Sequence, residues 1–309
     1  MNNIMKPYID LGKCILNDSE NCDDRTGAGT WSTFGHLLEF DTRLGAAFLT
    51  ERKLPLRSVA GELAWFVEGS SDVAVLHDQY KCSFWNEWGS PVTGTIGPMY
   101  GKQWRDSNGV DQLKDMMESA IITPNSRRLL VNTWIPSLLP DERQTPASNP
   151  EKGKMALAPC HFAFQIRLYD DSNDKCVKWV DLMFHLRSSD YFLGLPNNIA
   201  SYQMLLSMIA AHLTARTGVT HKTRWLKATL GDVHIYKNHV DACRELFTRE
   251  PSKITPEYHG QDVAFNYLLS SNRPELDDGG QTRGDILKHL HKGVHNYVPG
   301  PPIEGARNV

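Results

Sequence analysis

Long apolar runs are missing from this sequence of 309 residues, and none approaches the ~20 residues that cross a bilayer. The N-terminal segment also lacks the long apolar centre of a secretory signal peptide. Cysteine is sparse, and the scattered cysteines include no CxxC pair, which argues against a zinc site and against a dense disulfide framework. These absences favour a protein of the reducing cytoplasm, where a cysteine in an unusual context is a candidate nucleophile.

An excess of charge of one sign is missing as well. There are 33 Lys and Arg residues against 36 Asp and Glu residues, whereas a protein whose main partner is bulk nucleic acid is more often basic. A composition with 40% hydrophobic and 22% charged residues excludes a disordered chain, a collagen and a coiled coil. We therefore expect a globular protein that buries a sizeable core without disulfide staples.

Apolar spacing predicts both helices and strands along the chain. We expect helices over residues 3–17, 58–68, 112–122 and 199–217, a short helix from residue 238, and strands over 31–40, 128–134, 161–168, 177–186 and 227–235. Residues 89–109 are typical of a loop. The sum is an α+β fold, a single domain over residues 1–309 with one large, mostly antiparallel or mixed sheet covered by helices.

Two proline-containing segments stand apart from this pattern. Residues 136–153 hold several prolines between strand-like segments, so we interpret them as a surface insertion. Residues 296–309 form a C-terminal tail rich in Pro and Gly, for which we expect no helix.

The most unusual cysteine is Cys160, which stands between Pro159 and His161 where a strand is expected to begin. Most lone cysteines are small buried hydrophobic residues. A nucleophilic thiolate would need positive charge or hydrogen-bond donors nearby. The segment alone leaves both interpretations open.

Several arginines stand in turn-like contexts beside small or hydroxylated residues. Arg25 lies in a Gly-rich turn, Arg127 and Arg128 are adjacent, and Arg187 precedes Ser188. Each alone is typical of solvated surface, but a guanidinium fork beside a hydroxyl is also suited to binding phosphate.

Polar side chains also mark two later segments. Asn197 and Asn198 come just before the strongest predicted helix, where they could serve as turn and capping residues. An Asn amide can also pair with the N3–H and O4 edge of uracil. Strand alternation places His234 and Tyr236 on one face, either in the core or as partners for a sugar hydroxyl.

Taken together, the strings DRTGAG, RSVAGELAWF, WNEW, GPMYGKQWR, NSRR, LAPCHFAFQ, RSSDYFLGLP, NIASY and GDVHIYKNH resemble the thymidylate synthase family, in order and along nearly the whole chain. The resemblance implies that Cys160 adds to C6 of a uracil-type base and makes C5 a carbon nucleophile. It implies 5,10-methylenetetrahydrofolate as cosubstrate and no metal. It also implies a homodimer joined through the sheet face, acting on small molecules and not on a membrane or bulk nucleic acid.

The resemblance also assigns the other candidate residues. It implies that Arg25, Arg187 and Ser188 hold the 5′-phosphate, with Arg127 and Arg128 reaching the site of the other subunit. The remaining catalytic residues would be Glu62, which orders water and shuttles protons at O4, Tyr100 and His161 in the pocket wall, and Asp190. The remaining nucleotide-binding residues would be Asn198 at the pyrimidine edge, and His234 and Tyr236 at the 3′-hydroxyl. Folate would meet Trp85, Trp88, Asp190, Leu193, Gly194 and the residue at position 197, with Val309 closing over it.

The chain departs from the synthase pattern mainly on the folate side. Asn197 replaces the Phe of GLPFN, Pro55 replaces a His, Ser189 and Leu186 replace a Cys and a Gln, and the tail is more polar at Arg307 and Asn308. Asn at position 197 resembles the deoxycytidylate hydroxymethylases of bacteriophages, whereas Asn198 fits uracil.

These departures favour addition of water to the exocyclic methylene of the base, the reaction of a phage-type dUMP hydroxymethylase that would act in the host cytoplasm. The alternative is thymidylate synthase itself, in which hydride reduces the methylene to methyl. Further alternatives are a hydroxymethylase acting on dCMP or CMP and a catalytically silent relative that binds nucleotide or RNA.

Overall fold

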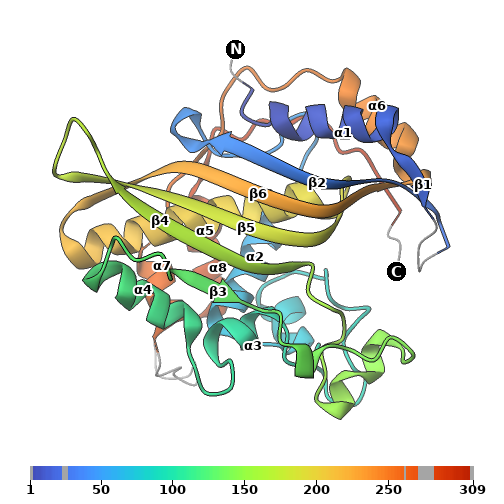
Figure 1. Ribbon diagram of the computed structural model, residues 1–309, viewed down its shortest axis with the longest axis horizontal. Coiled ribbons are helices and arrows are strands. Elements are labelled where there is room, and N and C mark those ends of the chain that lie inside the picture. Colours follow the sequence, from blue (N-terminus) through green and yellow to red (C-terminus); the bar gives the residue numbers. More distant parts are fainter. Residues whose placement is uncertain (1–2, 23–26, 261, 271–281, 307–309) are drawn as a thin grey trace.

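The structure, a computed structural model, describes residues 3–22, 27–260, 262–270 and 282–306. Its centre is a six-stranded sheet with the strand order β1-β2-β6-β5-β4-β3 (Figure 1). The strands are β1 (Glu20–Cys22), β2 (Thr30–Asp41), β3 (Leu130–Asn132), β4 (His161–Asp170), β5 (Val177–Asp190) and β6 (Thr220–Tyr236). β5 and β6 run parallel and the other neighbours antiparallel, which confirms the expected α+β fold with a mixed sheet.

Helices cover this sheet. In Figure 1, α5 and α2 lie beneath the central strands, whereas α1 and α6 lie beyond β2. The helices are α1 (Lys6–Asp18), α2 (Leu56–Glu68), α3 (Tyr100–Arg105), α4 (Gln112–Ile122), α5 (Gly194–Thr217), α6 (Val240–Thr248), α7 (Asp262–Leu269) and α8 (Arg283–Lys292). A small second sheet pairs β7 (Glu257–Tyr258) with β8 (Val294–His295).

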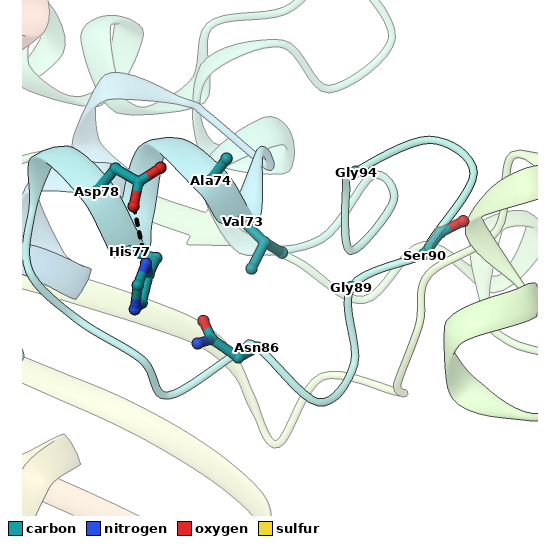
Figure 2. Close-up of a pocket in the computed structure, with 8 residues that line it drawn as sticks. All are labelled: Val73, Ala74, His77, Asp78, Asn86, Gly89, Ser90 and Gly94. Atoms are coloured by element: carbon teal, nitrogen blue, oxygen red, sulfur yellow. Dashed lines mark hydrogen bonds and ion pairs between the residues drawn. The ribbon is translucent and has the colours of Figure 1, made fainter.

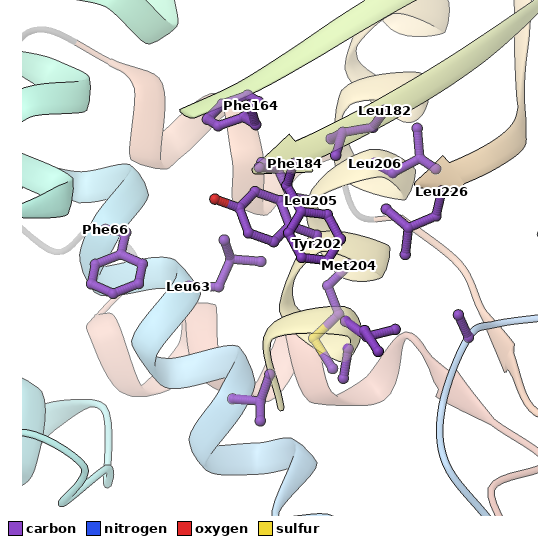
Figure 3. Close-up of a cluster of buried hydrophobic side chains, with 14 of the residues drawn as sticks. Leu63, Phe66, Phe164, Leu182, Phe184, Tyr202, Met204, Leu205, Leu206 and Leu226 are labelled. Carbon is purple, nitrogen blue, oxygen red and sulfur yellow. The ribbon is translucent and has the colours of Figure 1, made fainter. Parts of the chain in front are cut away.

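The core forms where α2 and α5 pack against the sheet (Figure 3). The ring of Tyr202 on α5 stacks on Phe184 of β5, with ring centroids 4.2 Å apart and planes 9° from parallel. Leu63 on α2 and Leu226 on β6 lie in the same buried cluster. Each such apolar side chain contributes roughly 1.5–3 kcal/mol on burial, so this layer holds α2 and α5 in place against the strands.

The buried face of β6 changes along the strand. Leu226, Ala228 and Leu230 are buried on one face, but beyond Gly231 the buried residues are Val233 and Ile235, on the other face. A Cβ at Gly231 would lie 2.5 Å from the carbonyl oxygen of Arg187, so β5 and β6 approach closely only because this position is glycine. As a result, the even-numbered residues of β6 beyond Gly231 are only partly buried, at the end of the sheet.

The prediction of a loop over residues 89–109 was wrong in part, because α3 lies within it. Gly101 lowers helix propensity, but a Cβ at this position would lie 2.7 Å from the carbonyl oxygen of Phe66. Close packing of α3 on α2 therefore requires glycine at position 101, and the same glycine is why the sequence did not predict a helix here.

The insertion at residues 136–153 contains three short 3₁₀ turns, over Pro136–Leu138, Pro146–Ser148 and Pro150–Lys152. It is anchored by Asn149, which is 1% exposed and accepts a hydrogen bond of 2.9 Å from the amide of Asp141. The segment is therefore an ordered surface feature built around one buried amide.

The described part of the tail, residues 296–306, contains no helix, as predicted. It runs back across the fold, where the amide of Gly300 donates to the carbonyl oxygen of Thr50 at 2.8 Å. Arg249 donates to the carbonyl oxygen of Pro301, and Ala306 accepts a hydrogen bond from His239. The tail therefore lies beside the strand ends that carry the predicted site.

The helices after residue 257 brace α2. Arg283 of α8 makes a bidentate ion pair with Glu68 of α2, and Glu68 also accepts a 2.5 Å hydrogen bond from the hydroxyl of Tyr80. Arg105 donates to the carbonyl oxygens of Leu268 and Leu269 at the end of α7, where helix carbonyls lack partners of their own. These contacts fix the helix that carries Glu62.

Candidate active site

Cys160 lies at the start of β4, in a loop tied to its surroundings through backbone groups. Its amide donates to the hydroxyl of Tyr100 at 3.0 Å, and its carbonyl oxygen accepts from the amide of Arg187 at 2.9 Å. The Arg187 guanidinium donates to the carbonyl oxygens of Pro159 at 3.1 Å and Ala158 at 2.8 Å. Burial raises the pKa of the Cys160 thiol, and the charge of Arg187 offsets part of that rise.

Glu62 projects from α2 and is 9% exposed. Its Oε1 accepts a hydrogen bond of 2.6 Å from the indole nitrogen of Trp85. Burial raises the pKa of Glu62 to about 7, and the Trp85 hydrogen bond opposes that rise. A carboxyl that titrates near neutral pH can both give and take a proton, as general acid–base catalysis requires.

Tyr100 and His161 form a stacked pair beside Cys160. Their ring centroids are 4.0 Å apart with planes 13° from parallel. The Nδ1 atom of His161 hydrogen-bonds the hydroxyl of Tyr202 at 3.0 Å, and burial lowers the pKa of His161 to about 3. The imidazole is therefore neutral at physiological pH, so it can polarise a neighbouring group but contributes no positive charge.

The parallel ladder between β5 and β6 brings four polar residues to the end of the sheet. Ser188 pairs in register with Asp232, and Asp190 pairs with His234. The ring of Tyr236 lies 5.1 Å from that of His234. The structure therefore gathers predicted phosphate, sugar and folate contacts from two strands that are separated in sequence by α5.

Asp232 orients His234. Asp232 accepts hydrogen bonds of 2.5 Å from Nδ1 of His234 and from the hydroxyl of Ser32 on β2. Burial alone would raise the pKa of Asp232, but these two hydrogen bonds outweigh it and lower the pKa below its ordinary value. Because an ionised carboxylate only accepts, Nδ1 of His234 carries a proton, and in the neutral form of the ring Nε2 is an acceptor.

The turn from β5 into α5 places the next group. Asp190 Oδ1 accepts from the amides of Phe192 at 2.9 Å and Leu193 at 3.2 Å, which begins the turn. A Cβ at Gly194 would lie 3.7 Å from Cβ of Asp190 and 4.0 Å from Oδ1 of Asn198. Asp190, Leu193, Gly194 and Asn198 are thus neighbours, all partly exposed.

Asn197 and Asn198 lie inside α5, so the alternative that they are turn or capping residues is wrong. Oδ1 of Asn197 is buried and has no hydrogen-bond partner within the part of the chain that the structure describes. A buried amide oxygen without a partner costs about 1–3 kcal/mol. This position therefore stands out among the departures from the synthase pattern.

Trp85 and Trp88 meet edge to face with ring centroids 5.4 Å apart, and Trp85 lies 5.6 Å from Tyr100. Trp85 is buried and Trp88 is partly exposed. The pair therefore extends the Tyr100 cluster outward and offers an aromatic wall beside Glu62.

Four predicted residues are not in this cluster. Arg127 and Arg128 are exposed and precede β3, whose Leu130 pairs with Gln165, so they lie toward the end of β4 away from Cys160. Arg25 and Val309 lie outside the described residues.

Sequence reasoning missed three residues of this region. Tyr202 partners His161, Asp232 orients His234, and His239 contacts the tail. Asp232 and His239 lie in the string GDVHIYKNH, and Tyr202 ends the string NIASY. The sequence therefore offered one clue to each residue, which is that it belongs to a string that resembles the family. Their contacts come from strand register and tail placement, which the motifs alone do not reveal.

A separate open cavity of about 400 Å³ lies beside the Trp85–Trp88 segment (Figure 2). Its wall includes Asn86 and the hydrogen-bonded side chains of His77 and Asp78, whose Nδ1 and Oδ1 atoms are 2.9 Å apart. It includes none of the residues predicted for catalysis, so it does not mark the reaction centre.

The described ranges contain neither a metal-ligating cluster nor a membrane-spanning helix. Within them, no group of three or more His, Cys, Asp and Glu side chains is placed to hold a metal ion. No described helix is long and apolar enough to cross a membrane.

Comparison with known proteins agrees with this geometry. The family described as "Thymidylate synthase" matches residues 6–266. A thymidylate synthase of Francisella philomiragia subsp. philomiragia is 41% identical over 249 residues, which cover 80% of this chain and 85% of that protein. A thymidylate synthase of Francisella tularensis subsp. holarctica matches with the same identity and coverage. A match over this share of the chain, on a fold that gathers Cys160, Glu62 and Tyr100, shows that the chain belongs to the thymidylate synthase family.

Proposed function

We propose that this protein transfers a one-carbon unit from 5,10-methylenetetrahydrofolate to C5 of dUMP through a covalent adduct at Cys160. The observation that carries the proposal is the placement of Cys160 against Tyr100 and Arg187, with the buried Glu62 in the same cluster. A nucleophile, a proton carrier and an aromatic wall are what the addition chemistry needs.

The steps follow from these groups. The Cys160 thiolate forms a bond to C6, and the electron pair of the C5–C6 double bond moves toward O4 as an enolate. The enolate carbon C5 then bonds to the one-carbon unit as the first of that unit's two bonds to folate nitrogens breaks. The second carbon–nitrogen bond breaks later, when tetrahydrofolate leaves and the C5 proton is lost. Glu62, with a pKa of about 7, is suited to move protons at O4 through water.

In this proposal the nucleotide is bound by residues at the ends of β5 and β6 and at the start of α5. Arg187 and Ser188 would bind the 5′-phosphate, Nε2 of His234 would accept a hydrogen bond from the 3′-hydroxyl, and Asn198 would pair with the uracil edge. Asp190, at the start of α5, would accept hydrogen bonds from folate. Homodimer formation, with Arg127 and Arg128 reaching the partner site, belongs to the same proposal and is supported by their exposure away from Cys160.

For the last step we favour hydride transfer to the exocyclic methylene, which gives dTMP and dihydrofolate. The similarity to proteins named thymidylate synthase supports this outcome over the hydroxymethylase expected from the sequence. In this reaction the hydride reduces the methylene to methyl, and the Cys160–C6 bond breaks to restore the double bond.

Asn197 favours a second candidate, dUMP hydroxymethylase. Its buried amide oxygen lacks a partner among the residues that the structure describes, and an ordered water would satisfy it. Water that added to the methylene at C5 would give 5-hydroxymethyl-dUMP and release tetrahydrofolate. This candidate differs from the first only in the fate of the methylene.

One experiment tests both. Purified protein is incubated with dUMP and methylenetetrahydrofolate, and both products are identified by mass spectrometry. A methyl product with equimolar dihydrofolate supports thymidylate synthase, and a hydroxymethyl product with tetrahydrofolate supports hydroxymethylase. Absence of both products with dUMP, or a product only from dCMP or CMP, would contradict the proposal.

Two variants sharpen the result. Cys160→Ala should abolish turnover and retain dUMP binding, because it removes only the nucleophile. Asn197→Phe should raise the ratio of methyl to hydroxymethyl product if the amide holds a water, with Asn197→Leu as an apolar control without a ring. An unchanged ratio in both would remove Asn197 from the choice of product.

A further inference from the structure

The hydroxyl of Tyr202 lies inside the core, next to the predicted active site. Tyr202 is on α5 and is 3% exposed, and its ring stacks on that of Phe184 and meets that of Phe164 edge to face. Figure 3 shows the hydroxyl pointing away from α5, toward α2. Its one hydrogen-bond partner among the described residues is Nδ1 of His161, at 3.0 Å. The packing of the ring therefore holds the hydroxyl against the histidine.

The direction of this hydrogen bond decides which nitrogen of His161 carries a proton. If Nδ1 donated to the phenol oxygen, the hydroxyl hydrogen of Tyr202 would be buried without an acceptor among the described residues, which is a costly state. If the hydroxyl donates to Nδ1, both groups are satisfied. Burial raises the pKa of Tyr202 well above its ordinary value, so the phenol keeps the hydrogen that this direction needs. The hydroxyl of Tyr202 is therefore the donor and Nδ1 the acceptor.

The proton of the imidazole is then on Nε2. Burial lowers the pKa of His161 to about 3, so the ring is neutral at physiological pH and has one N–H group. Because Nδ1 accepts from Tyr202, that group is Nε2–H. Nε2 makes no hydrogen bond with a described residue, and the side chain keeps an exposure of 6%. His161 therefore has one donor available to a group that enters the site.

The surroundings of His161 contain both reactive groups of the proposed mechanism. Its ring lies on that of Tyr100, whose hydroxyl binds the amide of the adjacent Cys160. Beyond the effect of burial, the charges of Cys160 and Glu62 raise the pKa of Tyr100, and the charge of Glu62 also raises the pKa of Tyr202. The nucleophile and the proton carrier are therefore close to the two phenols that flank this histidine.

We propose that Tyr202 is a positioning residue, whose hydroxyl donates to Nδ1 of His161 and thereby holds the imidazole as an Nε2–H donor for the bound pyrimidine. The inference rests on the proposed function, in which addition of the Cys160 thiolate to C6 moves negative charge to O4. A neutral donor that is already oriented stabilises such charge, directly or through a water, without reorganisation during the step. The opposite tautomer would present a lone pair to the same oxygen. Tyr202 therefore acts on the rate through His161 and from within the core.

The direct test determines which nitrogen of His161 is protonated. Protein made with nitrogen-15-labelled histidine is studied by two-bond proton–nitrogen correlation NMR, which distinguishes protonated from unprotonated ring nitrogens. The signals of His161 are identified by their loss in His161→Gln. At neutral pH the wild-type protein should carry the proton on Nε2 and none on Nδ1. A proton on Nδ1 would overturn the proposal, because Tyr202 would then be the acceptor.

Tyr202→Phe removes the donor and keeps the ring that packs on Phe184. We expect kcat to fall about threefold to tenfold, the usual effect of one hydrogen bond. The KM for dUMP should stay within about twofold of wild type, because the interaction strengthens only as charge forms on the base. The Nδ1 signal of His161 should move to the position of a nitrogen without a hydrogen bond. If this variant does not fold, the wild-type spectrum still decides the proposal.

Tyr8→Phe is the matched control. Tyr8 on α1 is also buried, stacks on Tyr191 with ring centroids 4.4 Å apart, and donates a 3.1 Å hydrogen bond to the carbonyl oxygen of Tyr191. Its loss should lower stability about as much as Tyr202→Phe does, with kcat and the His161 signals unchanged. An equal fall in kcat in both variants, or wild-type kcat in Tyr202→Phe, would overturn the positioning role.

The outcomes separate this inference from the proposed function. If the wild-type protein converts no dUMP, the proposed function fails, and the role of Tyr202 in that reaction fails with it. If dUMP is converted but Nδ1 of His161 is protonated, only the inference about Tyr202 fails.

Discussion

The amide of Cys160 donates a 3.0 Å hydrogen bond to the hydroxyl oxygen of Tyr100. Because the hydroxyl oxygen is the acceptor in this bond, the hydroxyl hydrogen of Tyr100 is left to point elsewhere, and burial raises the pKa of that phenol well above its ordinary value. Tyr100 therefore keeps its proton at working pH while it fixes the backbone of the nucleophile.

Tyr100→Phe should lower kcat and destabilise the fold. The variant removes the acceptor for a partly buried amide, which costs about 1–3 kcal/mol. The stacking on His161 would remain, so the loss is confined to the hydroxyl. Chemical denaturation and steady-state kinetics measure the two effects. Wild-type kcat together with wild-type stability would show that the Cys160 amide needs no acceptor there.

Glu62→Gln should make the protein more stable at high pH and less active. The pKa of Glu62 is about 7 in the fold against an ordinary 4.5, so the folded protein binds this proton more tightly than the unfolded chain does. The carboxyl therefore lowers the free energy of unfolding progressively from about pH 4.5 to pH 7, by about 3 kcal/mol in total. The difference in the free energy of unfolding between Glu62→Gln and wild type should be near zero at pH 4 and largest at pH 8.

Urea denaturation at both pH values, with Gln112→Ala as an unrelated amide control on α4, measures this difference. A stability difference that does not change with pH would show that Glu62 is not buried as a neutral acid. Turnover should fall in Glu62→Gln at every pH, because the amide cannot carry a proton.

Asp232→Asn should weaken dUMP binding through the sugar. The carboxylate fixes the proton of His234 on Nδ1, and an Asn amide can rotate to donate and reverse that tautomer. We expect the KM for dUMP to rise about tenfold, which corresponds to about 1.4 kcal/mol. The matched substrate is 2′,3′-dideoxyuridylate, which lacks the 3′-hydroxyl and whose binding should change little. Equal losses for both substrates would place the effect outside 3′-hydroxyl recognition.

Asn198→Asp should shift preference from dUMP toward dCMP. The amide donates to O4 and accepts from N3–H of uracil, whereas a carboxyl group presents different donors and acceptors to the 4-amino group and N3 of cytosine. Competition between the two nucleotides for turnover measures the shift, and Asn198→Ala controls for simple loss of the side chain. An unchanged preference would mean that another group reads the base.

Sequence patterns predicted most helices and strands, because the apolar spacing and the capping residues that form them lie within the same segment. The helix Gln112–Ile122 has the predicted bounds, since Asp111 caps its start and Pro124 follows its end. By contrast, α3 depends on the contact of Gly101 with α2, and β5 extends past its apolar segment because β6 continues beside it to Asp190. Such elements are set by neighbours distant in sequence.

The same division applies to the site. The motifs of the family resemblance identified Cys160, Glu62, His234 and Tyr236. The role of Asp232 depends on a hydrogen bond to His234 and on Ser32 of another strand, and the role of His239 depends on where the tail returns. Whether the product is methyl or hydroxymethyl depends on the groups around the exocyclic methylene. The identity of the residue at position 197 alone does not determine those surroundings.

The ladder between β2 and β6 sets a minimum time for folding during synthesis. Ser32 and Asp232, which hydrogen-bond across it, are 200 residues apart in the chain. At the usual rates of translation, β2 therefore emerges ~10–40 s before its partner. During that interval its apolar side chains, including Phe34, which is 84% exposed even in the finished fold, belong to an unpaired strand that could associate with other chains. Slower folding or a higher rate of expression should therefore lower the yield of this protein, first through association of β2 with other chains.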